Sequence, residues 1–146
     1  MIRILFAISA VTLGATMVLA QNVAPIKERQ DIMKKSNDDL KMLTAMSKGE
    51  TPFNATKASA TYAGMEEGYK KAQKLFPDDS KTGEKTRAAP KVWENKADFD
   101  SKMAAFIKVA GDAKAKATTE AGLKEIHPAV IKACDQCHEQ YRLRRQ

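Results

Sequence analysis

The sequence predicts an all-α protein, an antiparallel up-down-up-down bundle of four helices. Apolar residues recur three and four positions apart in four separate segments, which is the spacing of one face of a helix. The chain is rich in Ala, Lys, Met, Glu and Asp and poor in runs of β-branched residues. The links between the segments are short or moderate, so consecutive helices are expected to be antiparallel neighbours in one domain.

Residues 1–20 have the pattern of a signal peptide. Arg3 supplies a positive charge, an uncharged apolar run extends from Ile4 to Leu19, and small residues end the segment at Ala20. A membrane anchor needs about 20 apolar residues, and this run is shorter. We therefore expect cleavage before Gln21, export to the periplasm, a mature domain of residues 21–146 and no stable membrane insertion.

The first two helices are delimited by proline, glycine and a capping residue. Pro25 suits the first turn of the first helix, and Gly49 stops that helix. Asn54 is a suitable cap for the second helix, which is expected to end at Pro77. The inner faces contain Ile26, Met33, Leu40 and Thr44 in the first helix, and Ala58, Tyr62, Met65, Tyr69, Ala72 and Phe76 in the second.

A polar segment, residues 77–90, separates the second helix from the third. Loops of this length are usually functional or mobile. The third helix is expected to begin near Pro90 and the fourth near Thr119, with Pro128 interrupting or kinking the fourth. The inner face of the third helix contains Phe99, Met103, Phe106, Ala110 and Ala113, and that of the fourth contains Leu123, Ile126, Val130, Ile131, Cys134 and Tyr141.

The two cysteines of the chain lie three residues apart, at Cys134 and Cys137, and His138 follows directly. On a helix, residues three and four apart share one face. Cys-x-x-Cys-His is the attachment signal of c-type haem, in which two thioethers hold the porphyrin and the histidine binds the iron. The motif predicts one covalently attached haem c with His138 as the proximal iron ligand, which agrees with export to the periplasm.

Three other interpretations of the cysteine pair are weaker. A disulfide would close a very small loop and leave His138 unexplained. A zinc site would need four ligands, and the chain offers two Cys and two His. A thioredoxin-like redox pair belongs at a helix start in a βαβ unit.

A second axial ligand could come from histidine or methionine. His127 lies about three helical turns, roughly 16 Å, from His138 along the same helix, so it cannot bind the same iron. Met33 lies near the start of the mature chain, and an antiparallel bundle brings it level with His138. Methionine in a helix stripe often only fills space, so geometry alone leaves Met33 open as ligand or as packing.

The sequence resembles the class II c-type cytochromes, the cytochrome c prime family. The resemblance covers essentially the whole mature chain. It is strongest in Cys134-x-x-Cys137-His138 with Tyr141-Arg142 behind it, and in the stretch from Arg29 to Lys34. Residues 47–50 and 93–99 match as well, and a haem motif at the C-terminus is itself diagnostic of this family.

The resemblance implies one of two branches. High-spin members keep five-coordinate iron and bind nitric oxide or carbon monoxide, whereas low-spin members use a first-helix methionine as ligand and transfer electrons. Met33 falls on that ligand position, in a context similar to the low-spin pattern. We therefore expect a low-spin cytochrome that is not an enzyme, with gas binding as the alternative. The resemblance also implies that Arg29 and Arg142 lie near the haem propionates.

The basic composition predicts an acidic redox protein as the partner. The net charge is +7, and basic surfaces steer acidic partners toward them. Nucleic acid is not expected, because an exported protein rarely meets it and no basic segment is interleaved with aromatic residues. The charges expected around the haem end are Lys34, Lys35, Lys132, Arg142, Arg144 and Arg145. A homodimer is left open.

Overall fold

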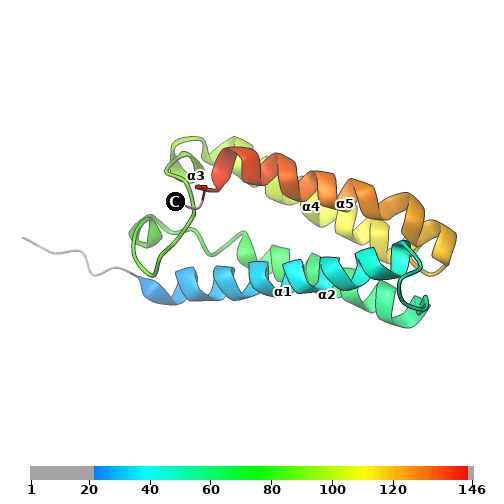
Figure 1. The fold of residues 1–146 in the computed structure, drawn as a ribbon. Coiled ribbons are helices and arrows are strands. Elements are labelled where there is room, and N and C mark those ends of the chain that lie inside the picture. The colour runs from blue at the N-terminus through cyan, green and yellow to red at the C-terminus, as the bar shows by residue number, and fades with distance from the viewer. Residues whose placement is uncertain (1–21, 145–146) are drawn as a thin grey trace, which may run out of the picture.

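The computed structural model describes residues 22–144, which form a long helical bundle (Figure 1). Its long helices are α1 (Val23–Ser47), α2 (Ala55–Ala72), α4 (Lys96–Lys116) and α5 (Glu120–Tyr141). Two short helices, η1 (Asp78–Ser80) and α3 (Lys91–Glu94), lie in the connection between α2 and α4. The predicted all-α class is confirmed, while the expected signal peptide, residues 1–20, lies outside the described residues.

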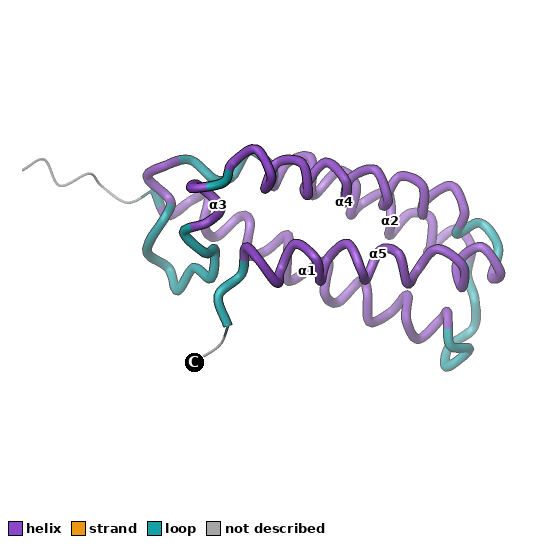
Figure 2. Tube along the Cα trace, turned by 90° about the horizontal axis from the view of Figure 1, so that it is seen from above, coloured by secondary structure: helices purple, strands orange, loops and turns teal. Residues whose placement is uncertain are grey.

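The four long helices pack in cyclic order. α1 contacts α2, α2 contacts α4, α4 contacts α5, and α5 contacts α1. Figures 1 and 2, seen at right angles, place these helices at the four corners of the bundle. The first and last helices are therefore neighbours, as the antiparallel prediction requires. Within residues 22–144, no helix has both the length and the apolar character needed to cross a membrane.

The core is built mainly from α2 and α4. Every inner-face residue predicted for α4 is buried, and all those predicted for α2 except Phe76 are buried. Tyr69 and Phe106 stack across these two helices with ring centroids 3.9 Å apart. The stripe of α1 is less complete, because Ile26 is buried but Met33, Leu40 and Thr44 are only partly buried. Burying this apolar surface is the main source of stability of such a bundle.

The boundaries of the second and third helices differ from the predictions. α2 ends at Ala72, not at Pro77. Residues 75 and 76 lie outside the helix, and their carbonyl groups accept hydrogen bonds from distant side chains. Arg29 Nη1 donates to Leu75 O, and Trp93 Nε1 donates to Phe76 O. The predicted third helix is divided into α3 and α4 by Asn95, whose φ of −128° and ψ of 57° are not helical.

Pro128 was predicted to interrupt or kink the last helix, and it does not interrupt it. Pro128 lies inside α5, which continues from Glu120 to Tyr141. The start of the helix is well capped, because the Thr119 side chain accepts a hydrogen bond from the Gly122 N–H. Pro128 has no backbone N–H, so α5 lacks one backbone hydrogen bond at this position. The helix nevertheless continues through Pro128 and packs against α4 and α1.

Candidate functional site

The last two turns of α5 carry the cysteine pair and the histidine. Cys134, Cys137 and His138 are all partly buried, and both cysteines are free thiols rather than a disulfide. Cys134 and Cys137 pack against the main hydrophobic core. The motif thus faces the interior of the bundle, near the end where α5 finishes (Figure 1).

Tyr69 of α2 links this motif to α1. Its hydroxyl donates a hydrogen bond to Met33 Sδ at 3.2 Å. Burial raises the pKa of Tyr69, and the neighbouring Cys134 and Cys137 raise it further. Tyr69 therefore contacts Met33 and belongs to the hydrophobic core against which Cys134 and Cys137 also pack. From the sequence Tyr69 was predicted only as a core residue, because its helical spacing carries no sign of the contact with sulfur.

The environment keeps the imidazole of His138 neutral. Burial lowers its pKa to about 4, and the positive charges of Arg142 and Arg87 lower it as well, while Asp135 opposes them. Neutral imidazole is the form that binds a metal. His138 is thus in the protonation state that ligation of iron requires at neutral pH.

The same burial makes the two thiols poor candidates for thiol exchange. Burial raises the pKa of Cys134 to about 12, with smaller contributions from Asp135 and Cys137. Burial also raises the pKa of Cys137. Reactive redox cysteines are exposed and have lowered pKa values, so this environment argues against a thioredoxin-like pair. Among residues 22–144, no group of three or more His, Cys, Asp and Glu side chains is arranged to hold a metal ion.

Arg29 is buried and holds the connection between α2 and α4. Its Nη1 donates to Leu75 O at 2.8 Å and Ser80 Oγ at 2.9 Å, and its Nη2 donates to Ser80 O at 2.8 Å and Thr86 Oγ1 at 3.0 Å. The guanidinium also lies 4.6 Å from the centroid of the Phe76 ring. Four of its five N–H donors are therefore engaged by this connection.

The C-terminal end of α5 is tied to the same connection. Arg142 N donates to His138 O, and Arg142 forms an isolated antiparallel bridge with Ala88. Arg87 donates from its side chain to Leu143 O. This contact could not be predicted from the sequence, because residues 87–89 and 141–143 pair through backbone groups that any residue could supply.

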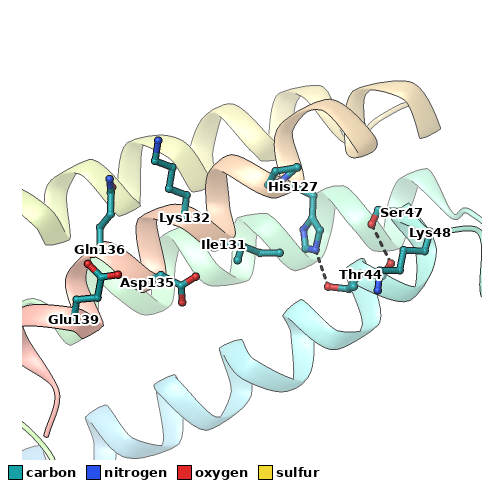
Figure 3. Close-up of a pocket in the computed structure, with 10 residues that line it drawn as sticks. Thr44, Ser47, Lys48, His127, Ile131, Lys132, Asp135, Gln136 and Glu139 are labelled. Atoms are coloured by element: carbon teal, nitrogen blue, oxygen red, sulfur yellow. Dashed lines mark hydrogen bonds between the residues drawn. The ribbon is translucent and has the colours of Figure 1, made fainter. Parts of the chain in front are cut away.

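Two hollows lie on α5. The smaller, about 200 Å³, lies between α4 and α5 and includes Cys137, Asp98 and Lys102 in its lining. The larger, about 660 Å³, lies between α1 and α5 (Figure 3). Its lining residues are Thr44, Ser47, Lys48, His127, Pro128, Ile131, Lys132, Asp135, Gln136 and Glu139. None of the predicted site residues lines the larger hollow, whereas Cys137 lines the smaller one.

Comparison with known proteins identifies the family. The family model described as Cytochrome C′ matches residues 24–142. A cytochrome c′ of Rhodopseudomonas palustris is 35% identical over 144 residues, covering 99% of this chain and 98% of that protein. The chain belongs to the cytochrome c′ family. Its cofactor is accordingly one covalently bound haem c with its iron.

Other members of the cytochrome c′ family support the same fold and carry two kinds of name. A cytochrome c-556 of Rhodopseudomonas palustris is 33% identical over 146 residues, with 97% of each chain covered. The solved cytochrome c′ of that organism has a TM-score of 0.79 and 36% identity, covering 84% of this chain and 98% of the other. A structural model of its oxidised cytochrome c556 has a TM-score of 0.73 and 30% identity, with 84% and 98% covered. These names do not decide whether this chain belongs to the electron-transfer branch or to the gas-binding branch.

The described residues fit a haem c. Two free thiols three residues apart and a neutral imidazole lie on one helix, and Met33 of α1 packs against the same core as the two cysteines. This is the donor set that covalent attachment and axial ligation of haem need. These donors come from two helices, α1 and α5, of which only α5 carries a recognisable sequence motif.

His127, the other histidine, belongs to a separate hydrogen-bond network near the far end of the bundle. Thr44 Oγ1 donates to Leu40 O at 2.7 Å, so it accepts from His127 Nε2 at 2.8 Å. Nδ1 then accepts from the Tyr62 hydroxyl at 2.8 Å. The network fixes neutral His127 as the Nε2–H tautomer, and Figure 3 shows His127 reaching Thr44 from α5.

We expect this network to make stability pH-dependent. Burial lowers the pKa of His127 below the ordinary histidine value of 6.5. Below pH 6.5 the unfolded chain therefore binds more protons than the folded one. The contribution of His127 to the free energy of unfolding is therefore fully present above pH 6.5, and it is lost as the pH falls toward the pKa of the folded state. Urea unfolding of the haem-loaded protein between pH 7.5 and about pH 5 measures this fall. His127→Gln, which keeps a donor and an acceptor, should flatten it; an unchanged slope would contradict the assignment.

Proposed function

We propose that the chain is a low-spin cytochrome that transfers single electrons in the periplasm. The observation that carries the proposal is the position of Met33 Sδ, which lies 3.2 Å from the Tyr69 hydroxyl in a side chain that packs against the same core as Cys134 and Cys137. Thioether sulfur is a soft ligand that haem iron accepts. A ligand from α1 opposite a histidine from α5 would close both axial positions.

Each residue has a distinct role in this proposal. Cys134 and Cys137 would hold the porphyrin through thioethers, and His138 would be the proximal ligand. Met33 would be the distal ligand, and Tyr69, which donates a hydrogen bond to its sulfur, would orient it. Haem iron with Met/His ligation supplies a one-electron couple of raised reduction potential. With two strong ligands, no position is left for a substrate, which supports a carrier rather than an enzyme.

Arg29 and Arg142 were predicted to contact the haem propionates. In the described conformation Arg29 has only its Nε donor left for such a contact, because its other donors bind residues 75–86. Arg142 is exposed and adjoins His138 through its backbone N–H. Propionate contact therefore stays a prediction, and Arg142 has the greater freedom to make it.

One observation favours the alternative of a five-coordinate, gas-binding protein. Met33 Sδ already accepts a hydrogen bond, so Tyr69 could hold the methionine as packing over the iron without a bond to it. A relative with 35% identity is named cytochrome c′. The family resemblance implies that members with five-coordinate iron bind nitric oxide or carbon monoxide.

Visible spectroscopy of the haem-loaded protein tests the proposal. We expect a low-spin spectrum in both oxidation states, and no carbon monoxide complex of the reduced protein at neutral pH, because both axial positions are filled. A reduced-minus-oxidised spectrum also reports covalent attachment. Immediate, saturable binding of carbon monoxide would contradict electron transfer as the function and support the gas-binding alternative.

A further inference from the structure

Charge is distributed unevenly over the bundle. Along the helices, lysines are commonly paired with carboxylates one turn away. Lys34 lies 3.9 Å from Asp38, and Lys35 lies 2.6 Å from Asp39. Similar pairs are Lys70–Glu66, Lys108–Asp112 and Lys124–Glu120. Lys34 and Lys35 were predicted to place positive charge around the haem end, and each has a carboxylate beside it. Arg145, predicted with them, lies outside the described residues.

A group of cations at the end of the bundle is not compensated in this way. It consists of Lys85, Arg87, Lys91, Arg142 and Arg144, which we call the basic end. None of them forms an ion pair with a described carboxylate. They come from the connection before α4 and from the segment after α5, and Figure 1 shows both at the same end of the bundle. The carboxylates nearest in sequence are Glu84, Glu94 and Glu139, three against five cations, so the basic end keeps a net positive charge.

An exposed apolar side chain lies among these cations. Leu143 is 47% exposed, and it and Ile131 are the large hydrophobic residues exposed among residues 22–144. Its backbone is held, because Leu143 N donates to Arg87 O at 2.8 Å and Leu143 O accepts from Arg87 Nε at 3.0 Å. An apolar centre surrounded by charge, on a backbone already fixed, is the usual composition of a protein interface.

The basic end adjoins the haem-binding motif. Arg142 N bonds to His138 O, one helical turn away, and Lys91 Nζ lies 6.0 Å from the centroid of the Tyr141 ring. A partner seated on Leu143 would therefore lie close to the proximal side of the site. Short distances favour electron exchange, and a small charged interface favours rapid association and release.

We propose that the basic end, centred on Leu143, is the surface on which an acidic redox protein docks to exchange electrons. This inference rests on the proposed electron-transfer function. Charge complementarity identifies the partner as an acidic protein surface, and exposed Leu143 identifies an apolar contact at its centre. The backbone hydrogen bonds between residues 87–89 and 141–143 hold this surface in one conformation in the absence of the partner.

Stopped-flow kinetics with reduced flavodoxin as an acidic one-electron donor tests the docking surface. In the haem-loaded protein, Lys91→Glu with Arg144→Glu should slow the second-order rate about tenfold at low salt. At about 1 M salt the rates should converge, since the Debye length there is about 3 Å. Leu143→Ser should slow the reaction ~threefold at every salt concentration, because it removes an apolar contact.

The matched control reverses two exposed lysines at the opposite end of the bundle, Lys48→Glu with Lys57→Glu. We expect less than a twofold change, although the net charge changes equally. Equal slowing by both pairs would show that only net charge matters and would overturn the proposal. A low-spin spectrum of the unmodified protein tests the proposed function separately, so the two can fail independently.

Anionic vesicles containing phosphatidylglycerol provide the remaining comparison. If Lys91→Glu with Arg144→Glu abolishes binding to these vesicles but leaves the flavodoxin rate unchanged, the basic end is a lipid-binding surface and the docking proposal is wrong. We expect the opposite pattern, with the flavodoxin rate affected and no vesicle binding by the unmodified protein.

Discussion

Met33→Ala should convert the haem-loaded protein from low spin to high spin. The side chain is partly buried, and its sulfur lies on the inward side of α1, where Tyr69 donates to it. Alanine cannot ligate iron, so the substitution would open the distal position and the reduced protein should then bind carbon monoxide. Optical spectra of both oxidation states measure the change. We also expect a lower reduction potential, because methionine ligation raises it.

A second methionine of α1 provides the matched control. Met42 is also partly buried and packs against the core, so Met42→Ala removes the same atoms from the same helix. We expect it to lower stability by roughly 2 kcal/mol or more while leaving the spin state unchanged. An unchanged low-spin spectrum in Met33→Ala would exclude Met33 as the ligand. A high-spin spectrum already present before substitution would favour the gas-binding alternative.

Local pattern was sufficient for most of the fold. The inner face of α4 was predicted residue by residue, because each of its members follows helical spacing and is buried against α2 or α5. That α1 and α5 are adjacent was predicted from the antiparallel topology alone. The motif in α5 needed no tertiary information either, since its three side chains are adjacent on one helix.

The errors arose where distant residues decide local structure. Helical pattern continues past Ala72 to Phe76, yet the chain leaves the helix because Arg29 and Trp93 bind the carbonyl groups of residues 75 and 76. Pro128 should weaken a helix, yet α5 continues through it. The contact of Tyr69 with Met33 and the basic end also depend on tertiary packing, so a single sequence did not reveal them.

Arg29→Met should destabilise the folded protein by about 3 kcal/mol. The substitution retains most of the apolar stem but removes four hydrogen bonds and leaves buried acceptors at Leu75 O and Ser80 O. It also removes the cation from the Phe76 ring. Burial lowers the pKa of Arg29 because it disfavours the charged form, and these bonds offset that cost. Urea unfolding of the haem-loaded protein, followed by circular dichroism, measures the loss.

The same substitution should release the connection between α2 and α4. Lys81 and Lys85 are already exposed. Ser80 and Thr86 both lose their bond to Arg29, so local opening should free the backbone beside these lysines to enter the active site of trypsin, and cleavage there should become faster well below the unfolding transition. Lys34→Met, a change of an exposed cation on the same helix, should alter stability by less than about 0.5 kcal/mol. If Arg29→Met behaves like Lys34→Met in both measurements, Arg29 is not the anchor. If only stability falls, the connection is held by its backbone contacts with residues 141–143, and the basic end would keep its shape without Arg29.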